Sequence, residues 1–440
     1  MDRLCRYPGE KPVRHILFPA AALALAACGS SDPSLDQTGA RPDLPDQRET
    51  LVPAMKIATP KGWGTERPVA PAGFTVTALA TGLAIPRQTL VLPNGDILVA
   101  EGSGGSAPML RPKDVIAGYI KSLGKSRVKG GNRITLLRDA DGDGVADMRT
   151  PFITGLNAPY GLAYVDGNVY VAAQDALLRF PYRDGDTRIT ARGQEVTKLP
   201  ARVNHHWTKA LAAGPDGSKL YVGIGSNSNV GERGMEVEED RAVVWEVDRR
   251  SGAHRTYVSG IRNPTALAVE PQTKRLWAVV NERDELGPQL VPDYMTALRP
   301  GAFYGWPYSY WGQNVDPRVH PQNPGMVRRA ARPDYALGSH VAALGIGFVS
   351  GGGMPGHTQG AFVGEHGSWN RQDLSGYKVV WIPFANGRPA GKPQDFLTGF
   401  LKDGHARGRP VGVTYDASSG ALLVADDVSN TVWRVAPARR

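Results

Sequence analysis

The chain has 440 residues but only two cysteines, Cys5 and Cys28, both near the N-terminus. No disulfide framework can therefore support the rest of the chain, and a chain of this length does not need one to build a core. The sequence has no Cys-x-x-Cys-His motif, which excludes covalent haem attachment. The formal net charge is +9, but the basic residues are scattered and form no dense run. We therefore expect no nucleic-acid partner.

Long hydrophobic runs are also missing, apart from one stretch at residues 16–28. It is too short to span a bilayer comfortably and follows a basic segment, as in a secretory signal peptide. It ends in the letters LAAC, with Cys28 last, which resembles a bacterial lipobox. We predict a signal peptide over 1–27 and a flexible linker over 28–71 that begins with lipidated Cys28. The protein is then expected in the periplasm, lipid-anchored to a membrane, in our interpretation the outer one; an ordinary signal peptide with an incidental cysteine is the alternative.

Helical patterns are scarce, and only residues 113–125 predict a helix, placed on a loop. Glycine is abundant, with 53 residues, and a short phrase recurs in which a tight turn precedes an apolar run. The copies lie at 93–101, 165–174, 214–225, 270–282, 356–368 and 416–427. Such a turn and run are typical of a β-hairpin. The six uneven copies predict an all-β, six-bladed β-propeller over 72–437, in which neighbouring sheets stack around a central channel.

A histidine pair, His205 and His206, lies shortly before the third copy and next to Trp207. A histidine at the channel end of a strand can serve as a general base. Because adjacent residues on a strand point to opposite faces, we expect one ring to face the channel and the other to pack. A structural or metal-binding pair is the alternative interpretation.

Two arginine motifs precede later copies of the phrase. Arg262 and Asn263 come before a proline that stiffens the loop, and a fixed guanidinium beside an amide suits a ligand with carboxylate or carbonyl groups. Arg407 and Arg409 are two residues apart, so in an extended loop they share one face. The alternatives are an ion pair between blades for the first motif and a solvated basic loop for the second.

Two acidic segments are candidates for metal binding. Glu282, Asp284, Glu285 and Asp293 could hold a hard cation or could form a solvated acidic turn. Residues 138–147 (RDADGDGVAD) space their aspartates like the start of a calcium loop but lack the glutamate at its twelfth position. This segment is either a separate structural calcium site or an Asp/Gly hairpin turn.

These features, in this order, resemble the soluble quinoprotein sugar dehydrogenases, and most closely their sorbosone dehydrogenase branch. The resemblance covers roughly residues 72–437. Its most specific parts are Arg-Asn-Pro at 262–264, Tyr-Gly-Trp-Pro at 304–307 and Arg-Gly-Arg at 407–409. It implies a six-bladed propeller that binds pyrroloquinoline quinone (PQQ) and calcium at the top of the channel.

The resemblance also implies roles for single residues. His206 would be the catalytic base that takes the proton of a substrate hydroxyl while hydride passes to PQQ. Arg262 would lie near the reactive quinone oxygens, as a catalytic and cofactor-binding residue, with Asn263 beside it. Arg407 and Arg409 match the late arginine pair with which the family contacts its cofactor.

Three further positions follow from the same resemblance. His366 and Arg371 are the nearest candidates for the place of the family's cofactor-binding lysine. The calcium ligands correspond to the stretch at Asp284 and Glu285. The aspartate that supports the catalytic histidine in glucose-oxidising members has no counterpart at 225–227, which reads Gly-Ser-Asn.

We therefore expect a PQQ-dependent oxidoreductase that oxidises a sugar, a polyol or a sugar aldehyde and passes electrons to an external acceptor. A calcium-dependent, lactonase-type propeller hydrolase is a second hypothesis. A non-enzymatic propeller that binds glycans or protein in the cell envelope is a third. A propeller fold alone does not separate the three.

Overall fold

The computed structural model describes residues 31–48, 55–105, 108, 112–350 and 354–438. The predicted signal peptide and Cys28 lie outside these residues. The described chain is nearly all β, with two α-helices, α1 (Pro112–Leu123) and α2 (Pro324–Arg329), and one 3-10 turn (Met235–Glu238). Helix α1 confirms the helix predicted over 113–125. Neither α-helix has the length and apolar character that crossing a membrane requires.

Six sheets of four or five strands follow one another along the described chain, each built mainly from antiparallel hairpins. The first sheet contains β4 (Pro86–Val91), β5 (Ile97–Glu101), β6 (Arg133–Arg138) and β7 (Met148–Ile153). The second contains β8 (Gly161–Val165), β9 (Asn168–Ala172), β10 (Ala176–Pro181) and β11 (Gln194–Lys198). The third contains β12 (Lys209–Ala213), β13 (Lys219–Ile224), β14 (Val243–Asp248) and β15 (His254–Ser259).

Two of the remaining three sheets include a strand from the N-terminal side of the chain. The fourth contains β16 (Pro264–Val269), β17 (Leu276–Val280), β18 (Pro292–Ala297), β21 (Tyr335–Ser339) and β1 (Thr38–Gly39). The fifth contains β22 (Ala343–Phe348), β23 (Gly360–Glu365), β24 (Lys378–Ala385), β25 (Arg388–Pro389) and β26 (Gln394–Leu397). The sixth contains β29 (Pro410–Asp416), β30 (Ala421–Asp426), β31 (Thr431–Pro437) and β3 (Phe74–Ala80). Smaller pairings join β2 (Thr59–Pro60), β27 (Leu401–Lys402) and β28 (His405–Ala406), and β19 (Ser309–Tyr310) with β20 (Asn314–Val315).

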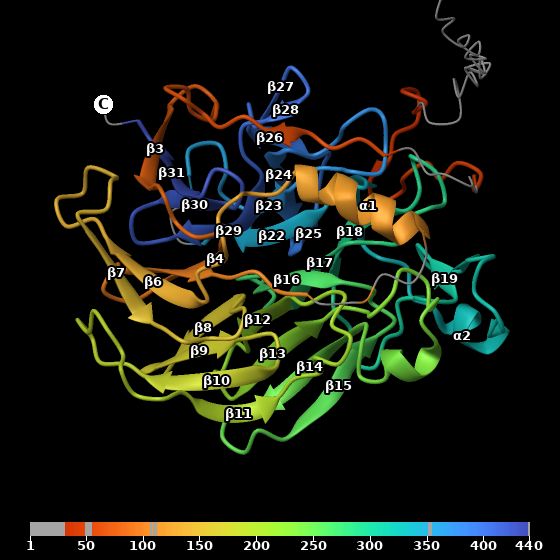
Figure 1. Cartoon of the computed structure of the whole chain (residues 1–440), viewed down its shortest axis with the longest axis horizontal. Coiled ribbons are helices and arrows are strands. Elements are labelled where there is room, and N and C mark those ends of the chain that lie inside the picture. Colours follow the sequence, from red (N-terminus) through yellow and green to blue (C-terminus); the bar gives the residue numbers. More distant parts are fainter. Residues whose placement is uncertain (1–30, 49–54, 106–107, 109–111, 351–353, 439–440) are drawn as a thin grey trace, which may run out of the picture.

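The six sheets close into a ring (Figure 1). The first strand of each sheet lies against the first strand of the next, and β29 of the sixth sheet lies against β4 of the first. Sheets arranged radially around a channel in this way form a β-propeller. The prediction of an all-β propeller is confirmed.

The recurring phrase marks the hairpin between the first and second strands of each sheet. Its turn glycines adopt positive φ, for example 88° at Gly95 and 69° at Gly217, which a glycine tolerates without strain. The apolar runs that follow become second strands such as β5 and β30, in which every residue is buried. They are buried on both faces because neighbouring sheets cover them. One shared cluster, for example, packs Leu98 and Leu136 of the first sheet with Val171 of the second.

The ring is closed by a strand from the N-terminal side. Strand β3 pairs antiparallel with β31, so the sixth sheet contains strands from both ends of the described chain. The described part of the predicted linker is also attached to the propeller, which corrects the expectation that 28–71 is flexible. β1 pairs with β21, β2 pairs with β28, and Ala58 and Trp63 are buried. Burial of these two apolar side chains stabilises an ordered segment despite its polar composition.

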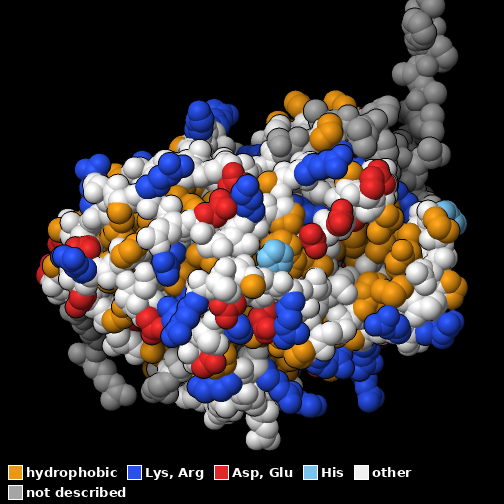
Figure 2. All heavy atoms as spheres, turned by 90° about the horizontal axis from the view of Figure 1, so that it is seen from below, with side chains coloured by type: hydrophobic (Ala, Val, Ile, Leu, Met, Phe, Trp, Pro, Cys, Tyr) orange, Lys and Arg blue, Asp and Glu red, His pale blue; other side chains and the backbone are white. Residues whose placement is uncertain are grey.

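Charged side chains are mixed on the surface. Figure 2 shows one face of the molecule, on which Lys and Arg side chains alternate with Asp and Glu side chains. This mixing agrees with the scattered basic residues in the sequence.

Candidate functional site

The candidate site lies at one end of the channel, where the first strands begin and the second strands end. Two adjacent cavities make up the site. The smaller one, of about 140 Å³, is lined by both histidines of the pair and is called the histidine cavity. The larger one, of about 520 Å³, is lined by several lysines and arginines and is called the cationic cavity. Lys121, Asn281, Ala342 and Trp369 line both, so we treat them together as the channel site.

The histidine pair is placed by a turn before β12. Val203 and Asn204 have positive φ of 64° and 50°, and β12 begins only at Lys209. His205 and His206 both line the histidine cavity, with ring centroids 4.7 Å apart. The expectation that one ring faces the channel while the other packs elsewhere is therefore wrong. Strand alternation does not apply, because the pair lies on a turn.

The protonation state of His206 follows from its contacts. Its Nδ1 lies 2.8 Å from the backbone carbonyl oxygen of Ser226. Because a carbonyl oxygen can only accept, Nδ1 carries the hydrogen and Nε2 keeps its lone pair. Burial, followed by the charge of Arg262, lowers the pKa of His206 well below its ordinary value. His206 is therefore neutral near pH 7 and can accept a proton at Nε2.

Ser226 and Arg241 support His206, and the sequence analysis did not identify either role. The Ser226 carbonyl oxygen faces Nδ1 of His206. Arg241 is buried and donates to the carbonyl oxygens of Pro200 (2.7 Å), His206 (2.7 Å) and Gly225 (2.6 Å), which ties the histidine turn to the end of β13. Such contacts to backbone atoms leave no side-chain motif in a sequence.

Arg262 and Asn263 come from the loop before β16 and reach the same cavity as His206. The Arg262 guanidinium is buried and donates to the carbonyl oxygens of Glu282 (2.6 Å) and Asn229 (3.2 Å). The Asn263 Oδ1 is buried without a hydrogen-bond partner among the described residues. The structure thus brings these three predicted site residues together.

Arg407 and Arg409 separate instead of sharing one face. Arg409 lines the cationic cavity and donates to the carbonyl oxygens of His366 (2.8 Å) and Gly367 (2.6 Å). Arg407 pairs with Glu66 of the N-terminal segment at 2.5 Å and lines neither cavity of the channel site. The loop between β28 and β29 turns one side chain toward the channel and the other toward that segment, which corrects the prediction of a joint contact.

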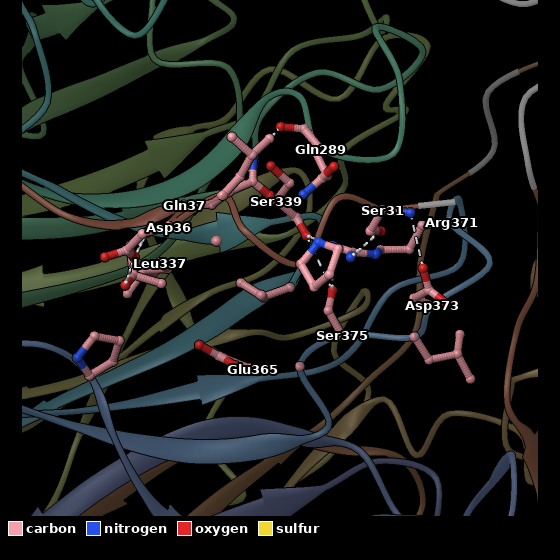
Figure 3. Close-up of a pocket in the computed structure, with 18 of the residues that line it drawn as sticks. Ser31, Asp36, Gln37, Gln289, Leu337, Ser339, Glu365, Arg371, Asp373 and Ser375 are labelled. Atoms are coloured by element: carbon pink, nitrogen blue, oxygen red, sulfur yellow. Dashed lines mark hydrogen bonds between the residues drawn. The ribbon is translucent and has the colours of Figure 1, made fainter. Parts of the chain in front are cut away.

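His366 and Arg371 also differ in position. His366 lines the cationic cavity, and its Nε2 lies 2.9 Å from Asp427 Oδ1. Burial lowers the pKa of His366 to about 4. Arg371 does not reach the channel site but lines a third cavity outside it, where it donates to the Ser339 carbonyl oxygen (Figure 3). Its proposed part in cofactor binding is not compatible with this position, because the chain still lines the channel site at Trp369 and Asn370 but the Arg371 side chain lines the third cavity instead.

A lysine at the site comes from α1. Lys121, in the last turn of α1, lines both cavities, and its Nζ lies 3.7 Å from the centroid of the Trp369 ring. Burial lowers its pKa below the usual value. The sequence predicted this helix, but not that its end would lie over the channel, because the contact joins segments far apart in the chain.

The cationic cavity collects positive charge. It is lined by the cationic residues Arg87, Lys121, Lys125, Lys129 and Arg409. Asp427 is the acidic residue in its lining and forms an ion pair with Arg87. The Arg87 Nε is buried without a partner among the described residues. The excess of positive charge favours an anionic ligand.

Three carboxylates line the histidine cavity: Glu282, Asp284 and Asp293. Burial raises the pKa of both Glu282 and Asp293 to about 7. Glu285, by contrast, binds Arg318 at 2.7 Å and lines neither cavity of the channel site. Of the two predicted calcium ligands, the structure therefore places Asp284 in the site and Glu285 outside it.

Another acidic group lies away from the channel. Asp139, Asp141 and Asp147, in the turn between β6 and β7, bring their oxygen atoms within 4.8 Å of one another. Their carboxylates accept backbone N–H groups of the same turn, for example from Gly142 and Gly144 to Asp139 at 2.9 Å. These bonds are those of an Asp/Gly turn.

Comparisons with known proteins now add to this geometry. A family model described as Domain of unknown function (DUF7133) matches residues 114–368, and one described as TrAA12-like matches residues 316–438. A curated protein of Borreliella burgdorferi, named only as an uncharacterized protein, is 28% identical over 303 residues, which are 64% of this chain and 76% of that protein.

Two further proteins carry more informative names. The pyrroloquinoline quinone-dependent pyranose dehydrogenase of Coprinopsis cinerea is 24% identical over 416 residues, 82% of this chain, but the chain spans only 53% of that protein. The calcium structure of a Trichoderma reesei carbohydrate-active enzyme of family AA12 has a TM-score of 0.68 at 18% identity and covers 89% of this chain and 99% of its own. At this identity the structural likeness shows a shared fold.

Proposed function

We propose a function in redox chemistry for this chain, which belongs to the family described as Domain of unknown function (DUF7133). The proposal rests on its channel site. The protein is a six-bladed propeller oxidoreductase that uses PQQ and calcium to oxidise a sugar, a polyol or a sugar aldehyde. One observation carries this proposal: a neutral histidine with a free Nε2 adjoins a cavity lined by cationic and aromatic side chains.

The cationic cavity fits PQQ by charge and shape. PQQ is a planar ring system with three carboxylates, and the cationic side chains around this cavity exceed its acidic ones. Trp207 and Trp369 supply flat apolar surfaces, and the unpartnered Arg87 Nε offers a buried donor. Arg87, Arg409 and Lys121 would hold the cofactor. The similarity to a curated PQQ-dependent pyranose dehydrogenase supports this choice of cofactor.

The histidine cavity fits a hard cation. The Oδ1 atoms of Asn263, Asn281 and Asn370 are buried without partners among the described residues, and the three residues line this cavity beside Asp284. Amide and carboxylate oxygens are the ligands that calcium prefers. The calcium structure with the same fold supports this choice of ion.

The residues of the channel site have distinct tasks in this proposal. His206 Nε2 accepts the proton of the substrate hydroxyl, and the Ser226 carbonyl keeps the hydrogen on Nδ1 so that Nε2 stays free. Arg241 holds the turn that carries His206, and Lys121 with Trp369 covers the two cavities. When bound, PQQ supplies the acceptor for the hydride and calcium supplies Lewis acidity.

The location proposed from the sequence complements this function. Cleavage before Cys28 and its lipidation would tether the propeller to a membrane on the periplasmic side. The sequence has no haem-attachment motif, so electrons would pass to an external acceptor, which would meet the protein at that membrane.

Reconstitution tests the proposed function. The purified chain is incubated with PQQ and Ca²⁺, and aldoses, polyols and sorbosone are screened with an artificial electron dye. We expect dye reduction with at least one substrate, and none when PQQ is left out. Hydrolysis of a lactone with Ca²⁺ but without PQQ, and no dye reduction, would instead support the hydrolase hypothesis.

A further inference from the structure

A third cavity, of about 740 Å³, lies between the fourth and fifth sheets and is called the side cavity (Figure 3). Its walls come from residues 31–38, from β21, from the end of β23, from the loop 371–376 and from β24 and β26. It shares no lining residue with either cavity of the channel site. It is therefore a separate site, formed where the N-terminal segment crosses from one sheet to the next.

Three buried groups in its lining lack hydrogen-bond partners among the described residues. The side chains are Ser339, Glu365 and Arg371, with exposed fractions of 1%, 2% and 9%. Their unpartnered atoms are Ser339 Oγ, Glu365 Oε2 and Arg371 Nε. A buried polar group without a partner is costly, so three of them around one cavity point to a ligand that completes their hydrogen bonds.

Most charged side chains around the side cavity already have a hydrogen-bond or ion-pair partner. Asp36 binds Lys392, Asp395 accepts from Lys378 at 2.6 Å, and Asp373 accepts from the Ser31 backbone N–H at 3.1 Å. The Arg371 guanidinium is also engaged, because it donates to the Ser339 carbonyl oxygen and to Ser31 Oγ. The lining has five acidic side chains (Asp32, Asp36, Glu365, Asp373 and Asp395) and two basic ones (Arg371 and Lys378), so it disfavours a phosphate-like anion. The ion pairs of Asp36 and Asp395 satisfy these two carboxylates without a cationic ligand.

The free groups are instead suited to hydroxyl groups. A hydroxyl donates and accepts, so one kind of group can satisfy the Arg371 N–H, the Ser339 hydroxyl and the Glu365 carboxyl at once. Leu337, Val341 and Leu374 supply apolar surface beside them, which suits the C–H faces of a sugar ring. We propose that the side cavity binds a neutral oligosaccharide of about two to four units, the size its volume accommodates. This binding site lies outside the channel and does not depend on the redox function.

Calorimetric titration tests this proposal. The full-length protein is titrated with cellotriose, maltotriose and xylotriose, with and without saturating PQQ and Ca²⁺. We expect one trisaccharide to bind with a stoichiometry of one, and equally well in both conditions. Ser339→Ala and Glu365→Ala should each weaken binding about tenfold, because each removes a side-chain hydrogen bond to the ligand. Ser251→Ala, on the exposed turn after β14, is the matched control and should bind like the wild type.

Four results would overturn the proposal. The first is that no trisaccharide binds while the protein is folded. The second is that PQQ displaces the saccharide, which would place it in the channel. The third is binding that both substitutions leave unchanged, while the melting temperatures of the two variants match that of the wild type. The fourth is preferential binding of spermine or sulfate. If the protein lacks dehydrogenase activity but binds saccharide at this cavity, only the proposed function fails.

Discussion

The channel site and the side cavity show how one propeller can make two sites with opposite selectivity. In the channel site, Arg87 and Arg409 belong to an excess of cationic side chains, and the buried carboxylates other than Asp427 line the histidine cavity. In the side cavity, Asp36 and Asp395 are ion-paired, and the unpartnered atoms are Ser339 Oγ, Glu365 Oε2 and Arg371 Nε. Charge thus selects an anion in the first site, and free hydrogen-bonding groups select a hydroxyl-rich ligand in the second.

The two sites also differ in how the chain builds them. The channel site is lined by loops at the ends of the first and second strands, and almost every sheet contributes to it. The side cavity uses only two neighbouring sheets and residues 31–38. Since they share no lining residue, substitutions in one site should act independently of the other.

The strongest test of this separation is His206→Ala. Loss of the base should lower dye-linked turnover by about 10²- to 10⁴-fold, the usual contribution of general base catalysis. PQQ affinity, measured by tryptophan fluorescence, should change little, because His206 lines only the histidine cavity. Because the pKa of His206 lies well below its ordinary value, wild-type turnover should also show no acid limb near pH 6.5.

Ser339→Ala is the matched change in the side cavity and should leave turnover unaltered. Full turnover in His206→Ala would reject its assignment as the base. Equal loss of turnover in both variants would show that the two sites are not independent.

The next largest effect should come from the two late arginines. Arg409→Ala should weaken PQQ binding by about 10- to 100-fold, as expected when a charge-assisted hydrogen bond is lost. Arg407→Ala should leave PQQ affinity unchanged, because Arg407 pairs with Glu66 and lines neither cavity of the channel site. Fluorescence titration of both variants decides between this geometry and a joint contact. Equal weakening of PQQ binding in the two variants would support the joint contact of Arg407 and Arg409 that the sequence predicted.

These arginines show how far the sequence could predict the site. The turn-and-run phrase predicted a propeller because it records a local hairpin that each sheet repeats. It also placed His206, Arg262 and Arg409 near strand ends that meet at the channel. It could not separate Arg407 from Arg409, because the partner of Arg407, Glu66, lies 341 residues away in the chain.

Other parts of the site depend on contacts that have no sequence motif. The group that orients His206 is a backbone carbonyl, at Ser226, so no residue type identifies it. Lys121 reaches the site only because α1 folds over the end of the ring. The side cavity depends on residues 31–38, whose polar composition predicted a flexible linker, although Gln37 is buried.

The free energy of unfolding of Glu365→Gln, measured at several pH values, should show how much the side cavity contributes to the pH dependence of stability. Burial raises the pKa of Glu365 from 4.5 to about 8, with nearby Asp395 and Asp293 adding to the effect and Lys378 opposing it. The folded state therefore holds a proton that the unfolded state releases between pH 4.5 and 8. Stability from this group is highest below pH 4.5 and falls by up to about 1.4 kcal/mol per pH unit as the pH rises to 8.

Glu365→Gln should remove this loss, so the stability of the variant relative to wild type should rise between pH 5 and 8 in urea unfolding. Glu282 and Asp293 of the histidine cavity, whose pKa values are also raised, keep part of the slope in both proteins. Glu195→Gln, at an exposed position of β11, serves as the control and should leave the slope unchanged. A parallel pH dependence of wild type and Glu365→Gln would show that Glu365 is ionised in the folded state.

The smallest effect should come from Lys121→Met, which removes the cation above the Trp369 ring but keeps the length of the side chain. A cation–π contact is worth about 0.5–2 kcal/mol. Loss of it, together with one positive charge at the cationic cavity, should weaken PQQ binding about threefold to tenfold. Lys121→Arg keeps the charge and should recover most of the affinity. Lys198→Met, at an exposed position of β11, controls for the change in net charge and should bind PQQ like the wild type. If both methionine variants weaken binding equally, net charge rather than the position of Lys121 determines the affinity, and the end of α1 takes no part in holding the cofactor.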